Sequence, residues 1–173
     1  MTTERRFAAF SRNASPPRTR EVPEGGMCMS VFVVIAQRGN PGAILLGKIN
    51  KKAQWDHLGA LDAERAERHS RGWMLPSSHL ILYESPQDGA QRIMREQLRI
   101  YDQKLEGPVT FAEAYGPMSH WDFEFVFHGT RDSVATNEAW TELKFVDMTR
   151  LKMAEVVRAQ ADVLASIGKW KQN

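Results

Sequence analysis

The sequence predicts an α/β or α+β fold built on a mixed β-sheet. Segments of β-branched and apolar residues precede, separate and follow two or three segments with helical periodicity. The length of 173 residues suits one domain with a short tail. Because a chain of this length buries a substantial apolar core, the fold needs no disulfide.

Composition excludes several classes of protein. The 23 Lys and Arg against 21 Asp and Glu give a net charge of +2, which disfavours a histone-like or basic-arm nucleic-acid binder. Cys28 is the single cysteine, so an internal disulfide framework and a zinc cluster built from cysteines are excluded. The longest apolar run, Val31 to Ala36, is far short of the roughly 20 residues that a membrane span needs. We therefore expect a soluble, cytoplasmic protein.

Two segments differ from the rest of a predicted single domain over residues 25–173. Residues 1–24 are rich in arginine and hold few large apolar side chains, so they are expected to form a flexible tail. Their Arg and Ser content also resembles an organellar transit peptide. A charged, helical insertion is expected at about residues 48–72. Such insertions often serve as lids or partner surfaces, although a solvated helix fits its charges equally well.

The first half of the chain supplies two strands and a helix. Residues 27–36 are apolar and β-branched, which is typical of a strand buried on both faces. The turn-forming sequence QRGNPG follows, and residues 43–48 then read as a second strand, so a β-hairpin is expected. A helix is predicted over residues 59–72, with Asp62 as its N-cap.

The second half contains the clearest helix start. Ser85 is a capping residue, Pro86 suits the first helical position, and Asp88 stands three residues after the cap. The helix is expected to continue to about Ile100. Three further strands are expected at residues 109–115, 122–128 and 143–146. A last helix, capped by Asp147 and ending at Gly168, would place Met153, Val157, Leu164 and Ile167 near its buried stripe.

The segment LPSSHLILYESPQDGAQRIMREQLRI, residues 75–100, resembles the Nudix box, written G-x5-E-x7-R-E-U-x-E-E-x-G-U with U aliphatic. Ser78 falls at the first Gly of this pattern, and Glu84 follows after five residues. Arg92 comes after seven more, and Glu96 takes the first position of the Glu pair. The resemblance implies a Nudix-type α/β/α sandwich with a mixed β-sheet.

The box departs from the family pattern at its metal-binding face. Ile93 stands where the family places a Glu with a metal or base role, and Gln97 replaces the second Glu of the pair. Only Glu96 remains of three carboxylates that would share one helix face. A hard dication held by one carboxylate and one amide oxygen would bind weakly, and Arg92 and Arg99 would repel it.

The resemblance implies candidates for each role in the site. Glu96 and Glu84 are the candidate ligands of Mg²⁺ or Mn²⁺, and Glu96 and His120 are the candidate catalytic residues, with His120 as the base. Arg92 and Trp121 are the candidate substrate-binding residues. Plainer interpretations stay open: Glu84 and Arg92 could brace a loop, and Trp121 could belong to the core.

Two functions follow from the resemblance. The first is a divergent Nudix-like hydrolase, a pyrophosphohydrolase that cleaves a nucleoside diphosphate linked to another moiety. The alternative is a catalytically inactive Nudix-fold module that binds a nucleotide-like ligand or a protein partner. The expected partner is a small-molecule, nucleotide-like ligand, no membrane partner is expected, and the charge balance argues against nucleic acid. Homodimers are common in the family.

Overall fold

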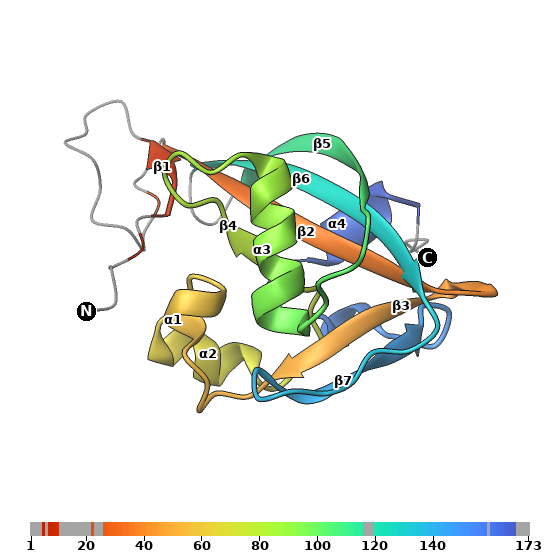
Figure 1. The fold of residues 1–173 in the computed structure, drawn as a ribbon. Coiled ribbons are helices and arrows are strands. Elements are labelled where there is room, and N and C mark those ends of the chain that lie inside the picture. The colour runs from red at the N-terminus through yellow and green to blue at the C-terminus, as the bar shows by residue number, and fades with distance from the viewer. Residues whose placement is uncertain are drawn as a thin grey trace.

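The computed structural model describes Arg5, residues 7–10, Val22 and residues 26–115, 120–158 and 160–168. Its centre is a mixed sheet of strand order β5-β6-β2-β3-β7, with the short strands β1 and β4 also paired to β2 (Figure 1). The strands are β1 Ala9–Phe10, β2 Met27–Gln37, β3 Asn40–Ile49, β4 Ser77–His79, β5 Glu106–Tyr115, β6 His120–Arg131 and β7 Trp140–Asp147. Among the named strands of the described residues, β2 and β6 pair in parallel and the other pairs are antiparallel, so the predicted mixed sheet is confirmed.

Helices lie on both faces of this sheet (Figure 1). They are α1 Trp55–Leu58, α2 Ala63–His69, α3 Pro86–Leu98 and α4 Ala161–Ser166, with a 3₁₀ turn η2 at Met153–Glu155. Because side chains alternate along a strand, β2 sends Val31 and Val33 into the core under α3 and Phe32 and Val34 into the core beside α4. This explains why the strand is apolar without alternation, and the layered α/β/α arrangement is confirmed.

Helix α3 begins as its residues predict and ends at a residue with a left-handed backbone. The hydroxyl of Ser85 accepts a hydrogen bond from the backbone N–H of Asp88 and donates one to its carboxylate, as the capping pattern predicts. The helix ends where Arg99 adopts a left-handed backbone conformation with φ of 57°. The Nudix pattern has glycine at this position, the residue that takes this conformation at least cost.

The charged insertion folds into two short helices, α1 and α2, rather than one. The predicted N-cap of α2 is confirmed, because the Asp62 carboxylate accepts a hydrogen bond from the N–H of Arg65 at 2.8 Å. Within residues 1–24, Phe7 is buried and Ala8 donates a backbone hydrogen bond to Leu80. The predicted flexibility of the other residues of this range falls mostly outside the described part of the chain.

The predicted last helix is wrong over most of its length. Asp147 ends β7 and accepts a hydrogen bond from the N–H of Thr149 in a turn. The backbone N–H of Trp73 donates to the carbonyl of Glu155, and its carbonyl accepts from the N–H of Val157. A continuous helix would need these two groups of Glu155 and Val157 for its own hydrogen bonds. Met153 is consequently 47% exposed. None of the helices in the described residues is long and apolar enough to cross a membrane.

Candidate functional site

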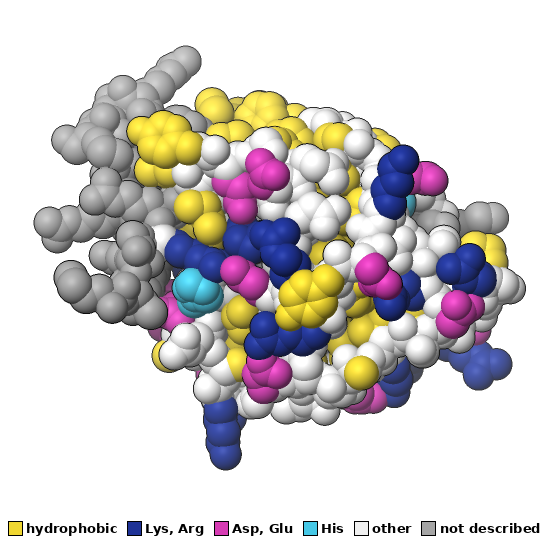
Figure 2. All heavy atoms as spheres, in the orientation of Figure 1, with side chains coloured by type: hydrophobic (Ala, Val, Ile, Leu, Met, Phe, Trp, Pro, Cys, Tyr) yellow, Lys and Arg dark blue, Asp and Glu magenta, His cyan; other side chains and the backbone are white. Residues whose placement is uncertain are grey.

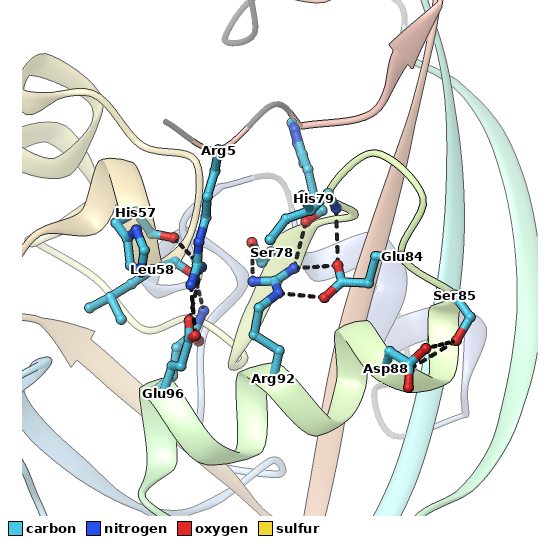
Figure 3. Close-up of polar contacts among 12 residues, drawn as sticks. Arg5, His57, Leu58, Ser78, His79, Glu84, Ser85, Asp88, Arg92 and Glu96 are labelled. Atoms are coloured by element: carbon cyan, nitrogen blue, oxygen red, sulfur yellow. Dashed lines mark hydrogen bonds and ion pairs between the residues drawn. The ribbon is translucent and has the colours of Figure 1, made fainter. Parts of the chain in front are cut away.

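Glu84 and Arg92 of the box form a buried ion pair that fixes the segment before α3 (Figure 3). Arg92 Nε and Nη2 donate to the two carboxylate oxygens of Glu84 at 2.7 and 2.8 Å. Arg92 also donates to the carbonyl of His79, and Glu84 accepts from the N–H of Ile81. Both oxygens of Glu84 are thus engaged within the protein, which favours the loop-bracing interpretation.

Glu96, the remaining carboxylate of the metal-binding face, is bound by an arginine from the N-terminal segment. Arg5 reaches down to α3, and its two terminal nitrogens donate to the two oxygens of Glu96 at 2.7 and 2.9 Å (Figure 3). Arg5 also donates to the carbonyl of His57 at 2.8 Å. Burial disfavours the charged carboxylate, but Arg5 outweighs it and the pKa of Glu96 lies below its usual value.

The two other positions of this face serve the fold. Ile93 is fully buried in the core under α3. The Gln97 amide donates to the carbonyls of Leu58 and Ser77 and accepts from the N–H of Ser77. The residues of the box therefore do not fit Mg²⁺ or Mn²⁺, because each polar group of the metal-binding face already has a protein partner.

A pocket of about 500 Å³ lies on the sheet face opposite α3. Polar side chains of two neighbouring strands form part of its wall, namely Cys28 and Ser30 of β2 and His120, Asp122 and Glu124 of β6. The parallel register pairs Cys28 with Asp122 and Ser30 with Glu124. Strand alternation then puts all five on one face.

Strand β4 connects the box to this pocket. Gln97 holds the backbone of Ser77, and Arg92 holds Ser78 and His79. The same three residues of β4 line the pocket. Helix α3 therefore acts as a scaffold that positions one wall of the pocket.

Arg158 is the most unusual residue of the pocket. Its backbone is left-handed, with φ of 62°, and such strain often accompanies a functional position. The guanidinium donates to the carbonyl of Gly59 at 2.9 Å and to the hydroxyl of Ser77 at 3.4 Å. Burial and the nearby charge of Arg65 lower its pKa to about 10. Among the described residues, no carboxylate forms an ion pair with it.

Burial also sets the charge of three other groups in the pocket. It lowers the pKa of His79 to about 3 and that of His69 to about 4, with the charge of Arg158 adding to both effects. Both imidazoles are therefore neutral at pH 7. Burial, reinforced by the charge of Asp122, raises the pKa of the Cys28 thiol, so this thiol is protonated at pH 7.

The structure separates the predicted site residues into three places. His120 lines the pocket, whereas Glu84, Arg92 and Glu96 lie on the side of α3. Trp121 is half exposed and is the next residue along β6, so it points away from the pocket face. The predicted catalytic pair of Glu96 and His120 is not brought together by any contact of the described residues, and the roles of these residues stay predictions.

Sequence reasoning missed Cys28, Asp122 and Arg158 as pocket residues. The alternation of DFEFVFH over residues 122–128 could have placed Asp122 and Glu124 on one face of a strand. The pairing with Cys28 needed the register of β2 against β6. No sequence pattern predicts Arg158 as a pocket residue, because its segment has the pattern of the charged face of a helix.

Among the described residues that Figure 2 displays, side chains of both charges lie on the surface around α3. Basic and acidic side chains are interspersed with apolar ones over the face that Figure 2 displays. Exposed ion pairs also form between the side chains of Glu64 and Arg68 and between those of Lys51 and Glu67.

Comparison with solved structures identifies the fold. The MutT protein from Methanosarcina mazei Go1 is 17% identical, and the match covers 84% of this chain and 95% of that one with a TM-score of 0.55. A C. elegans Ap4A hydrolase is 14% identical, with 80% and 95% covered and a TM-score of 0.52. The NUDIX domain of Shewanella oneidensis NrtR, complexed with ADP ribose, is 13% identical, with 83% and 85% covered and a TM-score of 0.54.

No protein-family model and no curated protein matches the sequence. The structural matches nevertheless extend over four fifths or more of this chain, and they agree with the box pattern of residues 78–100 and with its position at α3. The chain has the Nudix fold.

Proposed function

We propose that this protein is a Nudix-fold module that binds a small nucleotide-like ligand in the pocket of β2 and β6 and uses its box helix as a scaffold. The proposal rests on one observation: two carboxylates of the box, those of Glu84 and Glu96, each form an ion pair with an arginine of the protein. Glu96 is held by Arg5, and Glu84 is held by Arg92. No box carboxylate is left to hold the metal ion that would neutralise a diphosphate during hydrolysis.

The pocket has the size and chemistry of a small-molecule site. Its volume of about 500 Å³ lies within the roughly 300–1,000 Å³ typical of such pockets. Arg158 supplies a half-buried guanidinium for an anionic group. Asp122 and Glu124 supply acceptors for hydroxyl or amino groups of a sugar or base. The ADP ribose bound to the Nudix domain of Shewanella oneidensis NrtR supports a ligand of this class.

Hydrolysis remains a second candidate because of one residue. His120 lines the pocket, where an imidazole could take a proton from an attacking water. In this case the catalytic group would act from the pocket, and Glu96 would play no part in the reaction.

Calorimetric titration with nucleoside diphosphates and their sugar and nucleoside conjugates, ADP ribose and Ap4A among them, tests the proposal. We expect binding that Arg158→Gln weakens by about 10- to 150-fold, since a hydrogen bond to a charged group contributes roughly 1.5–3 kcal/mol. Arg150→Gln is the matched control, because Arg150 is an exposed arginine outside the pocket. Its affinity should equal that of the wild type.

Hydrolysis of the same ligands is then measured in the presence of Mg²⁺ or Mn²⁺, with the wild-type protein and with Glu96→Gln. The proposal expects no turnover that depends on Glu96. Metal-dependent turnover that disappears in Glu96→Gln would overturn it in favour of a box-dependent hydrolase. Absence of binding by every ligand of the panel would also overturn it.

A further inference from the structure

Three side chains that can ligate a metal converge at one end of the pocket. The parallel register pairs Cys28 of β2 with Asp122 of β6. His120 precedes Asp122 by two residues, so strand alternation puts all three side chains on the same face. Cys28 Sγ, a ring nitrogen of His120 and a carboxylate oxygen of Asp122 lie within 4.8 Å of one another. Backbone pairing, rather than a flexible loop, sets the positions of the two strands that carry them.

This set of donor atoms favours zinc. Sulfur, imidazole nitrogen and carboxylate oxygen are the three kinds of ligand that Zn²⁺ takes, whereas Mg²⁺ takes oxygen ligands. A tetrahedral Zn²⁺ with bonds of roughly 2.0–2.3 Å keeps its ligand atoms about 3.3–3.6 Å apart. Since the three atoms lie within 4.8 Å of one another, they need to approach by at most about 1.2–1.5 Å to reach these separations. A thiolate ligand further favours zinc over the harder cations.

The surroundings of the three residues support a ligand role. Cys28 is 1% exposed and His120 is 9% exposed, whereas Asp122 is half-buried. The hydroxyl of Ser30 donates to Asp122 Oδ1 at 2.9 Å, and such a bond orients a ligating carboxylate. All three residues border the pocket. Three protein ligands beside a cavity leave a fourth position for water or a ligand atom.

We infer that Cys28, His120 and Asp122 form a Zn²⁺ site whose fourth position opens into the pocket. When the ion binds, the Cys28 S–H bond breaks, its proton passes to solvent and a zinc–sulfur bond forms, with no oxidation or reduction. The open position takes an anionic oxygen, such as that of a phosphate or carboxylate group. The single cysteine excludes only clusters of several thiolates, since a mixed site needs one. Zinc binding requires no nucleotide, so it can be measured apart from the proposed function, with which it shares Asp122 and His120.

Titration of the metal-free full chain with Zn²⁺ and with Co²⁺ tests the site. We expect one ion per chain and, with Co²⁺, a near-ultraviolet charge-transfer band from the thiolate. Loss of an orienting hydrogen bond typically lowers metal affinity by about 10- to 100-fold. Ser30→Ala should therefore lower zinc affinity at least about tenfold, and Cys28→Ser or Asp122→Asn about 100-fold or more.

One variant serves as the matched control. His128→Asn removes another histidine of β6, one that lies outside the pocket. This substitution should not change zinc affinity. Unchanged zinc affinity in Cys28→Ser, or a wild-type cobalt complex without the thiolate band, would overturn the inference. The wild-type spectrum requires no substitution, so the test holds even if a variant fails to fold.

Arg158 separates this inference from the proposed function. Its positive charge acts on both Cys28 and Asp122, and it would repel a bound cation. Arg158→Gln should therefore tighten zinc binding while it weakens the binding of an anionic ligand. Loss of zinc affinity in Arg158→Gln would contradict the zinc site and leave the ligand proposal standing. Unchanged affinity of Arg158→Gln for the anionic ligand would contradict the ligand proposal and leave the zinc site standing.

Discussion

Replacing Arg5 and Glu96 singly and together tests whether the guanidinium of the N-terminal segment is the cation that this carboxylate binds in the folded protein. The two side chains lie 91 positions apart in the sequence and form two hydrogen bonds of 2.7 and 2.9 Å. The cycle uses Arg5→Gln, Glu96→Gln and the double variant, because glutamine keeps polarity and much of the volume while it removes the charge.

The burial of the pair sets the expected coupling energy. Exposed ion pairs contribute about 0.2–1 kcal/mol, and removal of one partner from a buried pair costs about 3–5 kcal/mol. The side chains of Arg5 and Glu96 are 15% and 28% exposed, between these limits. Two charge-assisted hydrogen bonds at this burial, screened in part by solvent, lead us to expect a coupling of about 1–2 kcal/mol.

Urea unfolding at pH 7 measures the four free energies of the cycle. The exposed pair of Glu64 and Arg68, whose side chains are 83% and 65% exposed, is the matched control, with an expected coupling of about 0.3–0.5 kcal/mol. A coupling between Arg5 and Glu96 no larger than that of the control would refute the reasoning. A rise in wild-type stability with Mg²⁺ that Glu96→Gln abolishes would refute it as well, because the carboxylate would then bind the metal.

Three further predictions concern residues around β4. Arg92→Ala leaves the carboxylate of Glu84 buried without its partner, so urea unfolding should show a loss of about 3–5 kcal/mol; a loss under 1 kcal/mol would be inconsistent with the buried pair. Gln97→Glu removes both amide donors to backbone carbonyls, so urea unfolding should show a free energy of unfolding lower by about 2–4 kcal/mol. A metal titration of this variant should show no Mg²⁺ binding. His79 is neutral in the folded state down to about pH 3 but takes up a proton near pH 6.5 when unfolded, so its contribution to stability should fall by at most about 1.4 kcal/mol per pH unit as the pH drops below 6.5. Urea unfolding from pH 7 to pH 4 should show this slope and His79→Gln should flatten it, whereas an equal slope in both proteins would speak against a buried neutral imidazole.

The elements that sequence predicts well are those specified by neighbouring residues. Ser85, Pro86 and Asp88 lie within one turn of each other, and the start of α3 follows from their local hydrogen bonding. The apolar run of β2 and the turn after it likewise predict the hairpin with β3. The predicted helix after Asp147 fails because backbone groups of Glu155 and Val157 bond to Trp73. A contact so distant in sequence overrides local propensity.

The metal-binding face of the box also has one feature that the sequence predicts and one that depends on a long-range contact. Its loss of carboxylates at Ile93 and Gln97 is visible in the sequence, as is the weakness of any Mg²⁺ site that would remain. The partner of Glu96 is not visible, because Arg5 belongs to a segment whose composition predicts a flexible tail. Composition describes the average of a segment, whereas the position of the half-buried Arg5 side chain depends on its long-range contact with Glu96.

The sequence by itself determined the fold class, the position and start of the box helix, and the incompleteness of its metal-binding face, because strand and helix periods and capping act between residues close in the chain. Only the tertiary structure decided that Arg5 neutralises Glu96, that Cys28 faces Asp122, and that Arg158 enters the same pocket as His120. These contacts join segments far apart in the chain, and their geometry depends on strand register and on how the insertion and the C-terminal segment pack on the sheet.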